Sequence, residues 1–383
     1  MAPHYRILLV SPILRPESGW GTYASLTAKE LMKRGHAVTA LVPKKTEHPC
    51  TQVAGLPPPL SLTNSPFARA AAAWKIIQAV HVHRPDIIHV LVEPYALAIP
   101  LARLFTKLPP WVMNLHGTYT VLPLEIPRTR RILCDAYSKV SLLLSCSDYT
   151  RKRTLEGIAK HCSGRAAERV ERRVRPFRFG IEQGTFVPHT NNTEKRILFV
   201  GHVKHRKGIM ELIRACGAFH RLSGSAFRLD VVGELDKGDP YIAAVKNAIR
   251  EEGLGAHVHL RGHLDSAALE ECFASADLFM MLSISEGAQY EGFGLVFLEA
   301  ASRGIPVIGS TGSGCAEALE EGVSGYALAS DDSAGIAGRM QDILEKNFIR
   351  REDCRKWAEQ HSMARQIDRF EEFYAEALSM RRD

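Results

Sequence analysis

Short apolar runs alternate with helical segments in two successive series along this chain of 383 residues. The first series opens with the apolar run Arg6–Val10, a loop over 11–22, a helical segment over 23–34 and a second apolar run over 37–42. Uninterrupted apolar runs of this length are typical of strands that are buried on both faces of a parallel sheet. The order strand, helix, strand forms a βαβ unit, which predicts a parallel sheet with helices on both faces.

The same alternation restarts after the polar stretch Thr190–Glu194, so the pattern indicates two sheets. The further strands that we expect are Asp86–Val92, Trp111–Leu115 and Ser141–Cys146 in the first series, and Arg196–Val200, Arg228–Val232, His257–Arg261, Leu278–Leu282 and Pro306–Gly309 in the second. The chain length also favours two domains over one very large core. We therefore expect an α/β protein with two Rossmann-like, doubly wound domains, 1–187 and 188–363, joined by a linker at about 186–195. The C-terminal helix, 364–383, is expected to pack back on the first domain.

The composition is that of an ordinary globular protein, and its formal net charge is +7. This charge fits phosphate-bearing ligands, nucleic acid or an anionic membrane surface without choosing among them. None of the eight cysteines forms a Cys-x-x-Cys pair, which argues against a zinc site or a small disulfide scaffold and favours a reduced protein. No apolar run approaches the roughly 20 residues that a membrane span needs, and the N-terminus has no signal-peptide pattern. We expect a cytoplasmic protein, at most peripheral to the inner face of a membrane.

Two glutamates form the most informative feature of the second series. Glu291 lies in the loop after an expected strand, and Glu299 lies inside the following helix. Gly292 and Gly294 flank Phe293, so backbone amides at the helix start can approach an anion closely. If these two glutamates were considered alone, the simplest interpretation would be that they are solvated acids on the surface. The apolar residues around Glu299 make an unpaired carboxylate costly there, which favours a binding role.

A basic loop, 201–208, follows the first strand of the second series and opens a helix. It contains His202, Lys204, Arg206 and Lys207. Cations next to free helix amides can neutralise a diphosphate and stabilise it as it leaves, whereas the alternative is a solvated basic turn. No Asp-x-Asp motif that would bind a metal is evident, so we expect no metal.

The first series offers two candidate segments. Gly19 and Gly21 lie in the expected loop after the first strand, where glycines permit close approach of the backbone to a ligand. Such a pair alone is more often only a tight turn. His116 ends the strand Trp111–Leu115, and the carboxyl ends of parallel strands are where ligand sites open.

An arginine-rich segment, Arg165–Arg178, contains six arginines and two acids. Their spacing of three and four residues spreads the charge over the faces of a helix. Most such runs are solvated surfaces. The alternative is contact with an anionic lipid surface or a phosphorylated acceptor.

The segment from Glu291 to Ala300, together with Gly304–Ile308 and Gly314–Glu317, resembles the signature region of retaining glycosyltransferases of family four. The resemblance implies the GT-B fold, in which two Rossmann-like domains face each other across a cleft that holds a nucleotide sugar. It also implies that Glu291 contacts the donor sugar and that Glu299 holds the ribose hydroxyls.

In this family the basic loop carries an arginine and a lysine. Lys207 matches the lysine, but His202 stands where the arginine is usual. Either His202 makes a weaker contact, or Lys204 or Arg206 takes over its role. The resemblance further implies that the glycine-rich loop lies against the donor and that His116 lies close to the donor sugar.

The expected activity is therefore retaining transfer of a sugar from a UDP- or GDP-sugar to a hydroxyl of a sugar or lipid-linked acceptor, in cell-surface glycan or glycolipid synthesis. No cofactor, metal or nucleic acid is expected. Expected catalytic residues are Glu291, His116 and Lys207; expected donor-binding residues are Gly19, Gly21, His202, Arg206, Lys207, Glu291, Gly292, Phe293, Gly294, Leu295 and Glu299. The alternatives are a sugar-nucleotide epimerase or a phosphorylase on the same fold, and a non-catalytic nucleotide-sugar binding protein.

Overall fold

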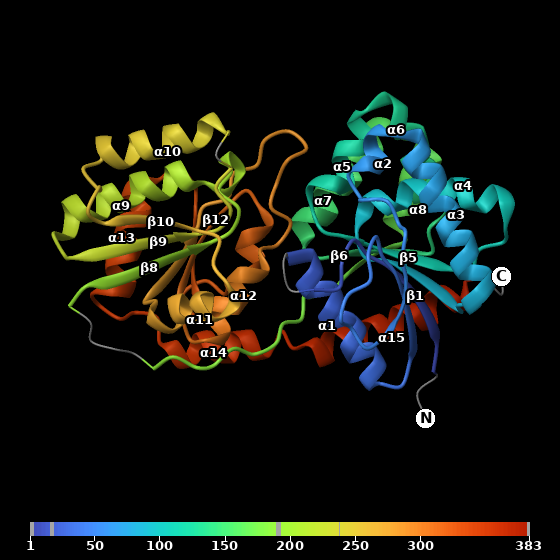
Figure 1. Cartoon of the computed structure of the whole chain (residues 1–383). Helices are drawn as coiled ribbons and strands as arrows, with labels where there is room; N and C mark the ends of the chain where they lie inside the picture. The colour runs from blue at the N-terminus through green and yellow to red at the C-terminus, as the bar shows by residue number, and fades with distance from the viewer. Residues whose placement is uncertain (1–3, 16–18, 189–192, 237, 381–383) are drawn as a thin grey trace. The chain divides into compact units, whose positions relative to one another are not determined.

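The protein divides into two compact units in the computed structural model (Figure 1). The structure describes residues 4–15, 19–188, 193–236 and 238–380. Unit 1 comprises Met1–Ile181 together with Met363–Asp383, and unit 2 comprises Glu182–Ser362. The linker expected at 186–195 includes residues 189–192, which lie outside the described residues.

Unit 1 contains a seven-stranded sheet in the order β3-β2-β1-β4-β5-β6-β7, and all its strand pairs are parallel. The strands are β1 (Arg6–Val10), β2 (Ala37–Leu41), β3 (Thr51–Val53), β4 (Ile87–Val90), β5 (Trp111–Leu115), β6 (Leu142–Ser145) and β7 (Val174–Pro176). The helices are α1 (Gly19–Lys33), α2 (Ser61–Asn64), α3 (Pro66–His83), η1 (Glu93–Ala98), α4 (Ile99–Phe105), α5 (Thr118–Glu125), α6 (Pro127–Lys139), α7 (Asp148–His161), α8 (Gly164–Glu171) and α15 (Met363–Ser379). Every residue of β4, β5 and β6 is buried, including the polar His89 and Asn114, as is typical of parallel strands that are covered on both faces.

Unit 2 contains a six-stranded parallel sheet in the order β10-β9-β8-β11-β12-β13. The strands are β8 (Lys195–Val200), β9 (Phe227–Val232), β10 (Val258–Gly262), β11 (Leu278–Met281), β12 (Val307–Ser310) and β13 (Gly325–Leu328). The helices are η2 (His205–Lys207), α9 (Ile209–Ser223), α10 (Pro240–Glu251), α11 (Ser266–Ser275), α12 (Leu295–Ser302), η3 (Gly314–Ala318), α13 (Ser333–Leu344) and α14 (Arg351–Glu359). Two parallel α/β sheets in two units confirm the predicted fold class.

The first helix begins earlier than the sequence predicts. Residues 11–22 were expected as a loop, with the helix starting at Tyr23, whereas α1 already begins at Gly19. Gly19 and Gly21 therefore belong to the first turns of α1 and not to a loop. Residues 16–18, in the middle of the expected loop, lie outside the described residues.

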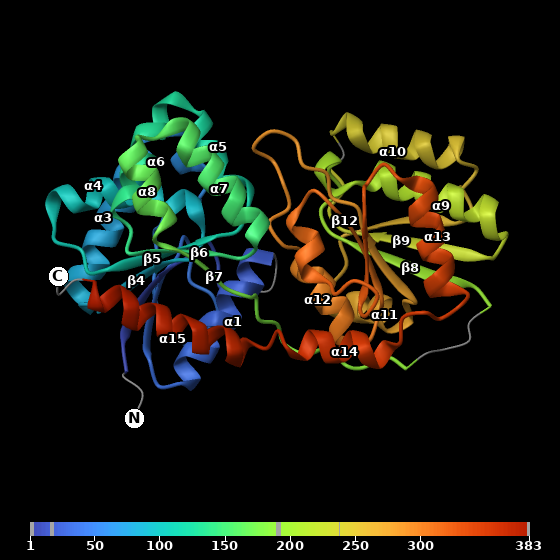
Figure 2. The ribbon, with the colours of Figure 1, turned by 180° about the vertical axis from the view of Figure 1, so that it is seen from behind.

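The C-terminal helix α15 lies against α1 and β5 of unit 1 (Figure 2). A buried polar network ties it to the sheet. His89 of β4 contacts the hydroxyl of Tyr374 through Nδ1 at 2.7 Å and Oδ1 of Asn114 through Nε2 at 2.8 Å. The side-chain amides of Asn114 and Gln366 both donate to the hydroxyl of Tyr23, at 3.0 and 3.2 Å. Because each partner is buried, losing one would leave an unsatisfied polar atom in the core.

Cys134 of α6 and Cys162, which follows α7, form a disulfide, with Cα atoms 5.6 Å apart. The expectation of a fully reduced protein is wrong for this pair. The remaining six cysteines are free thiols, and five of them are buried. The two bonded residues are distant in sequence, so their pairing depends on how α6 packs against the end of α7.

None of the helices within the described residues is long and apolar enough to cross a membrane.

The stability of unit 1 is expected to depend on pH through His89. Burial lowers the pKa of His89 from 6.5 to about 4, an effect that exceeds the opposing hydrogen bond to Asn114. Between these values the unfolded chain binds a proton that the folded chain excludes, so the free energy of unfolding decreases by about 1.4 kcal/mol per pH unit as the pH falls from 6.5 towards 4.

Denaturant unfolding at pH 7 and pH 5 measures this loss. The variant His89→Gln should show a shallower pH dependence, whereas His263→Gln, at an exposed position of unit 2, should behave like the wild type. An unchanged slope in His89→Gln would contradict the assignment.

Candidate functional site

Two neighbouring strands of unit 2 bring the expected site segments together. β8 pairs with β11 in parallel, so the loops that follow both strands emerge at the same edge of the sheet. The loop after β8 continues into η2, and the loop after β11 continues to α12. The two loops are joined directly, because the amide of Ile284 donates to the carbonyl of Arg206 at 2.9 Å.

Glycines allow these loops to pack closely. Gly208 adopts a φ of +67° between η2 and α9, and a Cβ atom there would collide with the carbonyl oxygen of Leu282. Gly314 approaches Gly292 equally closely and donates its amide to the carbonyl of Glu291 at 2.9 Å. The loop that carries Glu291 is therefore packed closely against Gly208 near its start and against Gly314 near its end.

The carboxylate of Glu291 binds two cations of the basic loop. Its Oε2 atom accepts from Nζ of Lys207 at 2.6 Å and from Nη1 of Arg206 at 2.7 Å. Glu291 and Lys207 expose only 15% and 14% of their side chains, and Arg206 exposes 34%. Burial alone would raise the pKa of Glu291, but the charges of Lys207 and Arg206 outweigh it and lower this pKa to about 2. The three side chains form a charged cluster with two positive charges and one negative charge.

Glu299 lies in α12 with a half-buried side chain. Burial raises the pKa of its carboxyl group, an effect opposed by Arg303 and reinforced by Glu270. Arg303 forms an ion pair with Glu270 instead, and donates only to the backbone carbonyl of Glu299 at 2.8 Å. Among the described residues we find no hydrogen bond or ion pair to the Glu299 carboxylate, so its oxygens can accept hydroxyl groups of a ligand.

His202 lies apart from the charged cluster. Its Nδ1 atom is 3.4 Å from Oε2 of Glu234, and its buried Nε2 atom has no hydrogen-bond partner within the described residues. Burial and the nearby Lys204 lower the pKa of His202. Of the basic residues that the sequence offered in place of the usual arginine, Arg206 is the one that reaches Glu291.

The remaining predicted residues of unit 2 surround the start of α12. Gly294 precedes the helix with a φ of +90°, and Leu295 is its first residue. Gly292 and Phe293 are buried. The first amides of α12 thus follow Glu291 closely in sequence, and free amides at a helix start can bind an anion.

His116 follows the carboxyl end of β5 in unit 1. Its Nε2 atom donates to the carbonyl of Leu91 at 2.8 Å, which leaves Nδ1 as an acceptor in the neutral ring. Burial lowers the pKa of His116 to about 4, so the ring is neutral at pH 7. The rings of Phe179 and Tyr23 hold it, with centroids 5.3 and 5.2 Å away.

Glu93 is a site residue that the sequence analysis missed. It is buried, and its Oε1 atom accepts from the amides of His116 at 2.5 Å and Gly117 at 3.2 Å. Burial raises the pKa of Glu93 to about 7, and its Oε2 atom has no hydrogen-bond partner in the described part of the chain. The signal in the sequence was an acid directly after an apolar run, at the strand end where parallel sheets place their sites.

Gly19 and Gly21 differ in their surroundings. A Cβ atom on Gly21 would collide with the carbonyl oxygen of Arg15, whereas Gly19 has open space around it. Gly21 is therefore required by packing within unit 1, and Gly19 alone offers an accessible backbone.

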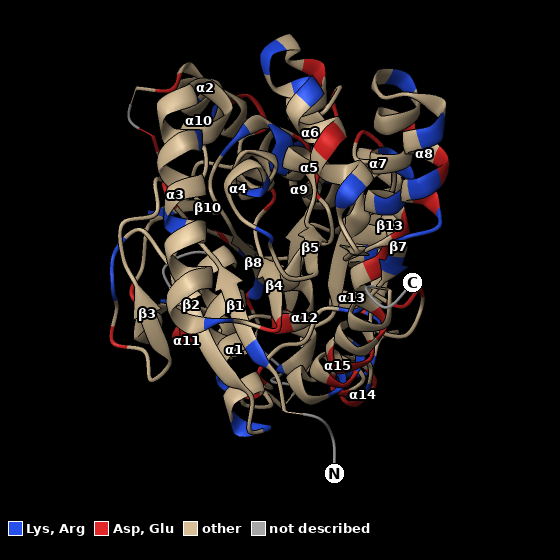
Figure 3. Ribbon diagram, turned by 90° about the vertical axis from the view of Figure 1, so that its right-hand side faces the viewer, with Lys and Arg blue, Asp and Glu red and all other residues tan. Residues whose placement is uncertain are grey.

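The arginine-rich segment spans α8 and β7. Figure 3 colours Lys and Arg blue along α7 and α8. Arg165, Arg169, Arg172 and Arg178 are exposed, and Arg175 forms an ion pair with Glu376 at 2.6 Å. Contact of the exposed arginines with an anionic surface stays a prediction.

Each of the two units is matched by a model of a known protein family. The family model "Glycosyl transferases group 1" matches residues 182–361, and the model "Glycosyltransferase Family 4" matches residues 18–162. A sucrose synthase from Acidithiobacillus caldus is 32% identical over 186 residues, which are 46% of this chain and 23% of that protein. A glycogen synthase from Mycobacterium tuberculosis is 31% identical over 158 residues, which are 41% of this chain and 35% of that protein.

A GDP-mannose-dependent alpha-(1-6)-phosphatidylinositol monomannoside mannosyltransferase from Mycolicibacterium smegmatis is 26% identical over 267 residues, covering 66% of this chain and 65% of that protein. This chain thus matches less than two thirds of the length of each of these relatives. Among solved structures, a sucrose-phosphate synthase from Thermosynechococcus elongatus superposes with a TM-score of 0.75 at 18% identity, covering 98% of this chain and 97% of that chain. The Anabaena protein HepE, solved in complex with UDP and glucose, superposes with a TM-score of 0.72 at 18% identity, covering 98% of this chain and all of that chain.

The close approach of the two loops predicts a specific cost for Gly208→Ala. Both Gly208 and Gly224 have a φ of +67°, so an alanine at either position is strained by about 1 kcal/mol. Only the alanine at Gly208 also collides with Leu282, and Gly224 has open space. Thermal unfolding should show a clearly larger decrease in melting temperature for Gly208→Ala than for Gly224→Ala. Equal decreases would mean that the two loops are not packed as described.

Proposed function

We propose, on the premise that this chain belongs to glycosyltransferase family four, that it transfers a sugar from a nucleoside-diphosphate sugar to a hydroxyl group of an acceptor. The observation that carries this proposal is the convergence of Lys207 and Arg206 on Glu291 at the carboxyl edge of the unit 2 sheet. The cluster bears one net positive charge and lies beside the first amides of α12. A diphosphate is the ligand group that this combination suits best.

In the proposed donor complex, Lys207, Arg206 and the amides after Gly294 bind the diphosphate. Their charge stabilises the nucleoside diphosphate as it leaves, which is where negative charge develops in the reaction. Glu299, whose carboxylate accepts no hydrogen bond in the described residues, takes the ribose hydroxyls. Its position within α12, after the amides, matches the order of phosphate and ribose in a nucleotide.

Glu291 has two tasks in this proposal. Its carboxylate holds Lys207 and Arg206 in place before the donor arrives, and it contacts the donor sugar afterwards. Because its pKa is about 2, Glu291 is ionised at neutral pH and can accept hydroxyl groups but cannot act as an acid. The neutral ring of His116 offers Nδ1 as an acceptor for a further sugar hydroxyl.

The reaction proposed is retaining. The bond from the anomeric carbon to the diphosphate oxygen breaks, and a bond to the acceptor oxygen forms on the same face of the sugar. The proton of the acceptor hydroxyl passes to the departing phosphate oxygen, so no further base is needed. A metal ion is not part of this scheme, and full activity in the presence of EDTA is the expected result.

We infer the classes of donor and acceptor from the names of the relatives. Their names include the synthesis of sucrose, glycogen and a mannosylated phosphatidylinositol. We propose a UDP- or GDP-sugar as the donor and a sugar or lipid-linked hydroxyl as the acceptor, in the synthesis of a cell-surface glycan or glycolipid.

A panel of nucleotide sugars tests the donor site. The true donor should raise the melting temperature, because a ligand that binds only the folded chain stabilises it. Glu299→Gln should lose most of this increase, since the ribose contact needs a charged acceptor. Glu271→Gln, an exposed position on α11, is the matched control and should retain the increase.

Turnover distinguishes an enzyme from a sensor. Donor and acceptor together should release nucleoside diphosphate, and Lys207→Gln should slow this release about 100-fold or more. Donor stabilisation without nucleotide release with any acceptor would favour a non-catalytic binding protein, and conversion of the donor alone would favour an epimerase.

Glu291→Gln should separate binding from turnover. The wild-type carboxylate competes with the diphosphate for Lys207 and Arg206, so the variant should bind nucleoside diphosphate a few-fold more tightly. Its kcat should nevertheless fall about 100-fold, because the cations and the sugar are no longer positioned. Calorimetry and initial rates measure the two effects, with Glu234→Gln as the control carboxylate beside His202. Weaker nucleotide binding in Glu291→Gln would refute the competition.

A further inference from the structure

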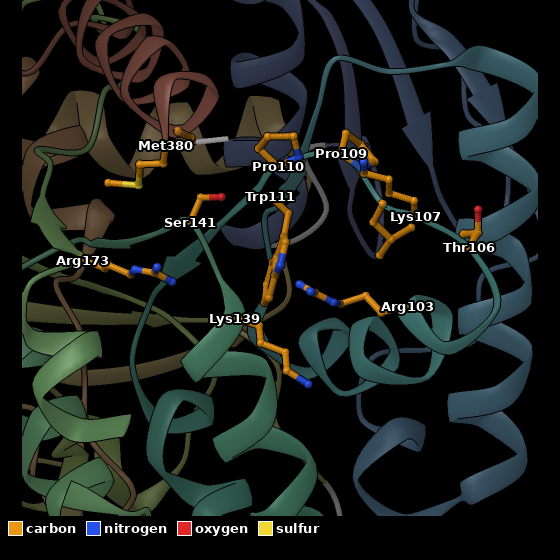
Figure 4. A pocket seen from close by; sticks show the side chains of 12 residues that line it. Arg103, Thr106, Lys107, Pro109, Pro110, Trp111, Lys139, Ser141, Arg173 and Met380 are labelled. Carbon is orange, nitrogen blue, oxygen red and sulfur yellow. The ribbon is translucent and has the colours of Figure 1, made fainter. Parts of the chain in front are cut away.

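A pocket of about 480 Å³ opens in unit 1 at the amino ends of β5 and β6 (Figure 4). It lies at the opposite end of β5 from His116, since Trp111 begins this strand and Leu115 ends it. At about 3.3 Å per residue the two ends are roughly 13 Å apart. The pocket is therefore separate from the candidate site of unit 1.

Positive charge dominates the lining of this pocket. Its cations are Arg103, Lys107, Lys139 and Arg173, and none of the described residues that line it is acidic. Lys139 is compensated by Asp135, its neighbour on α6, at 2.5 Å. Arg103 and Lys107 are exposed and form no ion pair among the described residues. Three cations thus remain without a carboxylate.

Arg173 is held in place by a backbone carbonyl, and no ion pair joins it to an acid of the described chain. Its Nη1 atom donates to the carbonyl of Val140 at 2.6 Å. Burial lowers the pKa of Arg173, and the nearby Arg169 lowers it further. Both effects destabilise the charged form of the Arg173 guanidinium. An anion bound beside it would therefore stabilise that charged form.

Trp111 supplies the observation that points to a ligand. Its side chain is buried, yet its indole Nε1 atom has no hydrogen-bond partner in the described part of the chain. Figure 4 shows the indole in the middle of the pocket lining, with Arg103 and Arg173 reaching toward it from opposite sides. A buried N–H group without an acceptor costs free energy, and an anion between these cations would satisfy it once the side chains that cover the Nε1 atom move aside.

Cations at the carboxyl end of a helix can have a purely structural role, and their presence there is no evidence for ligand binding. Arg103 and Lys139 lie in the last turns of α4 and α6, where the helix dipole favours positive charge. That role explains neither Lys107, which follows α4, nor the indole N–H of Trp111. The combination of these two groups with Arg173 carries the inference.

We propose that this pocket binds a phosphate group, with the indole of Trp111 donating one hydrogen bond and Arg103, Lys107 and Arg173 supplying the charge. The phosphate belongs either to a soluble phosphorylated compound or to the headgroup of an anionic lipid. Met380 and the prolines of the lining give the pocket an apolar side as well. The site is independent of the donor site proposed for unit 2.

The indole N–H resonances of the full chain test this directly. The chain has four tryptophans, and Trp111→Phe assigns the resonance of Trp111 while keeping an aromatic ring in the core. Titration with glycerol 3-phosphate should shift this resonance downfield and saturate. The double variant Arg103→Gln and Lys107→Gln should weaken the apparent affinity about ten-fold or more, because two exposed cations are lost.

A matched control removes the same charges elsewhere. Lys246→Gln with Arg250→Gln changes one lysine and one arginine that are exposed on α10 of unit 2, and should leave the titration unchanged. A lipid source is tested by cosedimentation with vesicles of phosphatidylcholine and phosphatidylglycerol in equal amounts. Binding that is reduced in the Arg103/Lys107 variant and retained in the control supports a lipid headgroup as the source.

A saturable shift of Trp111 with glycerol 3-phosphate, without vesicle binding that depends on Arg103 and Lys107, supports a soluble phosphate compound. The proposal is overturned if the Trp111 resonance does not move and both double variants cosediment like the wild type. Neither result depends on sugar transfer, so a failure here leaves the proposed function of the chain untouched.

Discussion

The parallel pairing of β8 with β11 is the constraint on which the candidate site depends. Parallel strands end at the same edge of a sheet, so a basic loop after one strand and an acidic loop after the next must meet there. Gly208 and Gly314 then let the backbones approach until Lys207 and Arg206 reach Glu291. Residues 84 and 85 positions apart in the sequence are thus brought together by the hydrogen bonds of the sheet.

The electrostatics of the two units differ in kind. In unit 2 the cations lower the pKa of Glu291, so the carboxylate is charged and firmly held. In unit 1 burial governs, and it raises the pKa of Glu93 while it lowers that of His116. Unit 1 therefore offers the neutral ring of His116 and a carboxyl group that titrates near pH 7, whereas unit 2 offers a charged carboxylate with two cations.

Much of this arrangement could be predicted from local patterns in the sequence. Apolar runs indicated both sheets, and the spacing of Glu291, Glu299 and Lys207 singled out the segments that unit 2 brings together. Glu93 also follows an apolar run, but its sequence position alone did not single it out, because its importance comes from two amides of a neighbouring strand end. The disulfide between Cys134 and Cys162 also depends on the packing of two helices, which spacing along the chain does not reveal.

Unit 1 is assembled from two stretches of chain that are separated by all of unit 2. During synthesis on a ribosome, the sheet of unit 1 emerges first but lacks α15, and His89 has not yet met Tyr374. Unit 2 emerges later, but all its strands leave the ribosome before α15 does. The second unit can therefore finish folding before the first, and the nascent chain must keep the incomplete unit from aggregating until its final helix leaves the exit tunnel.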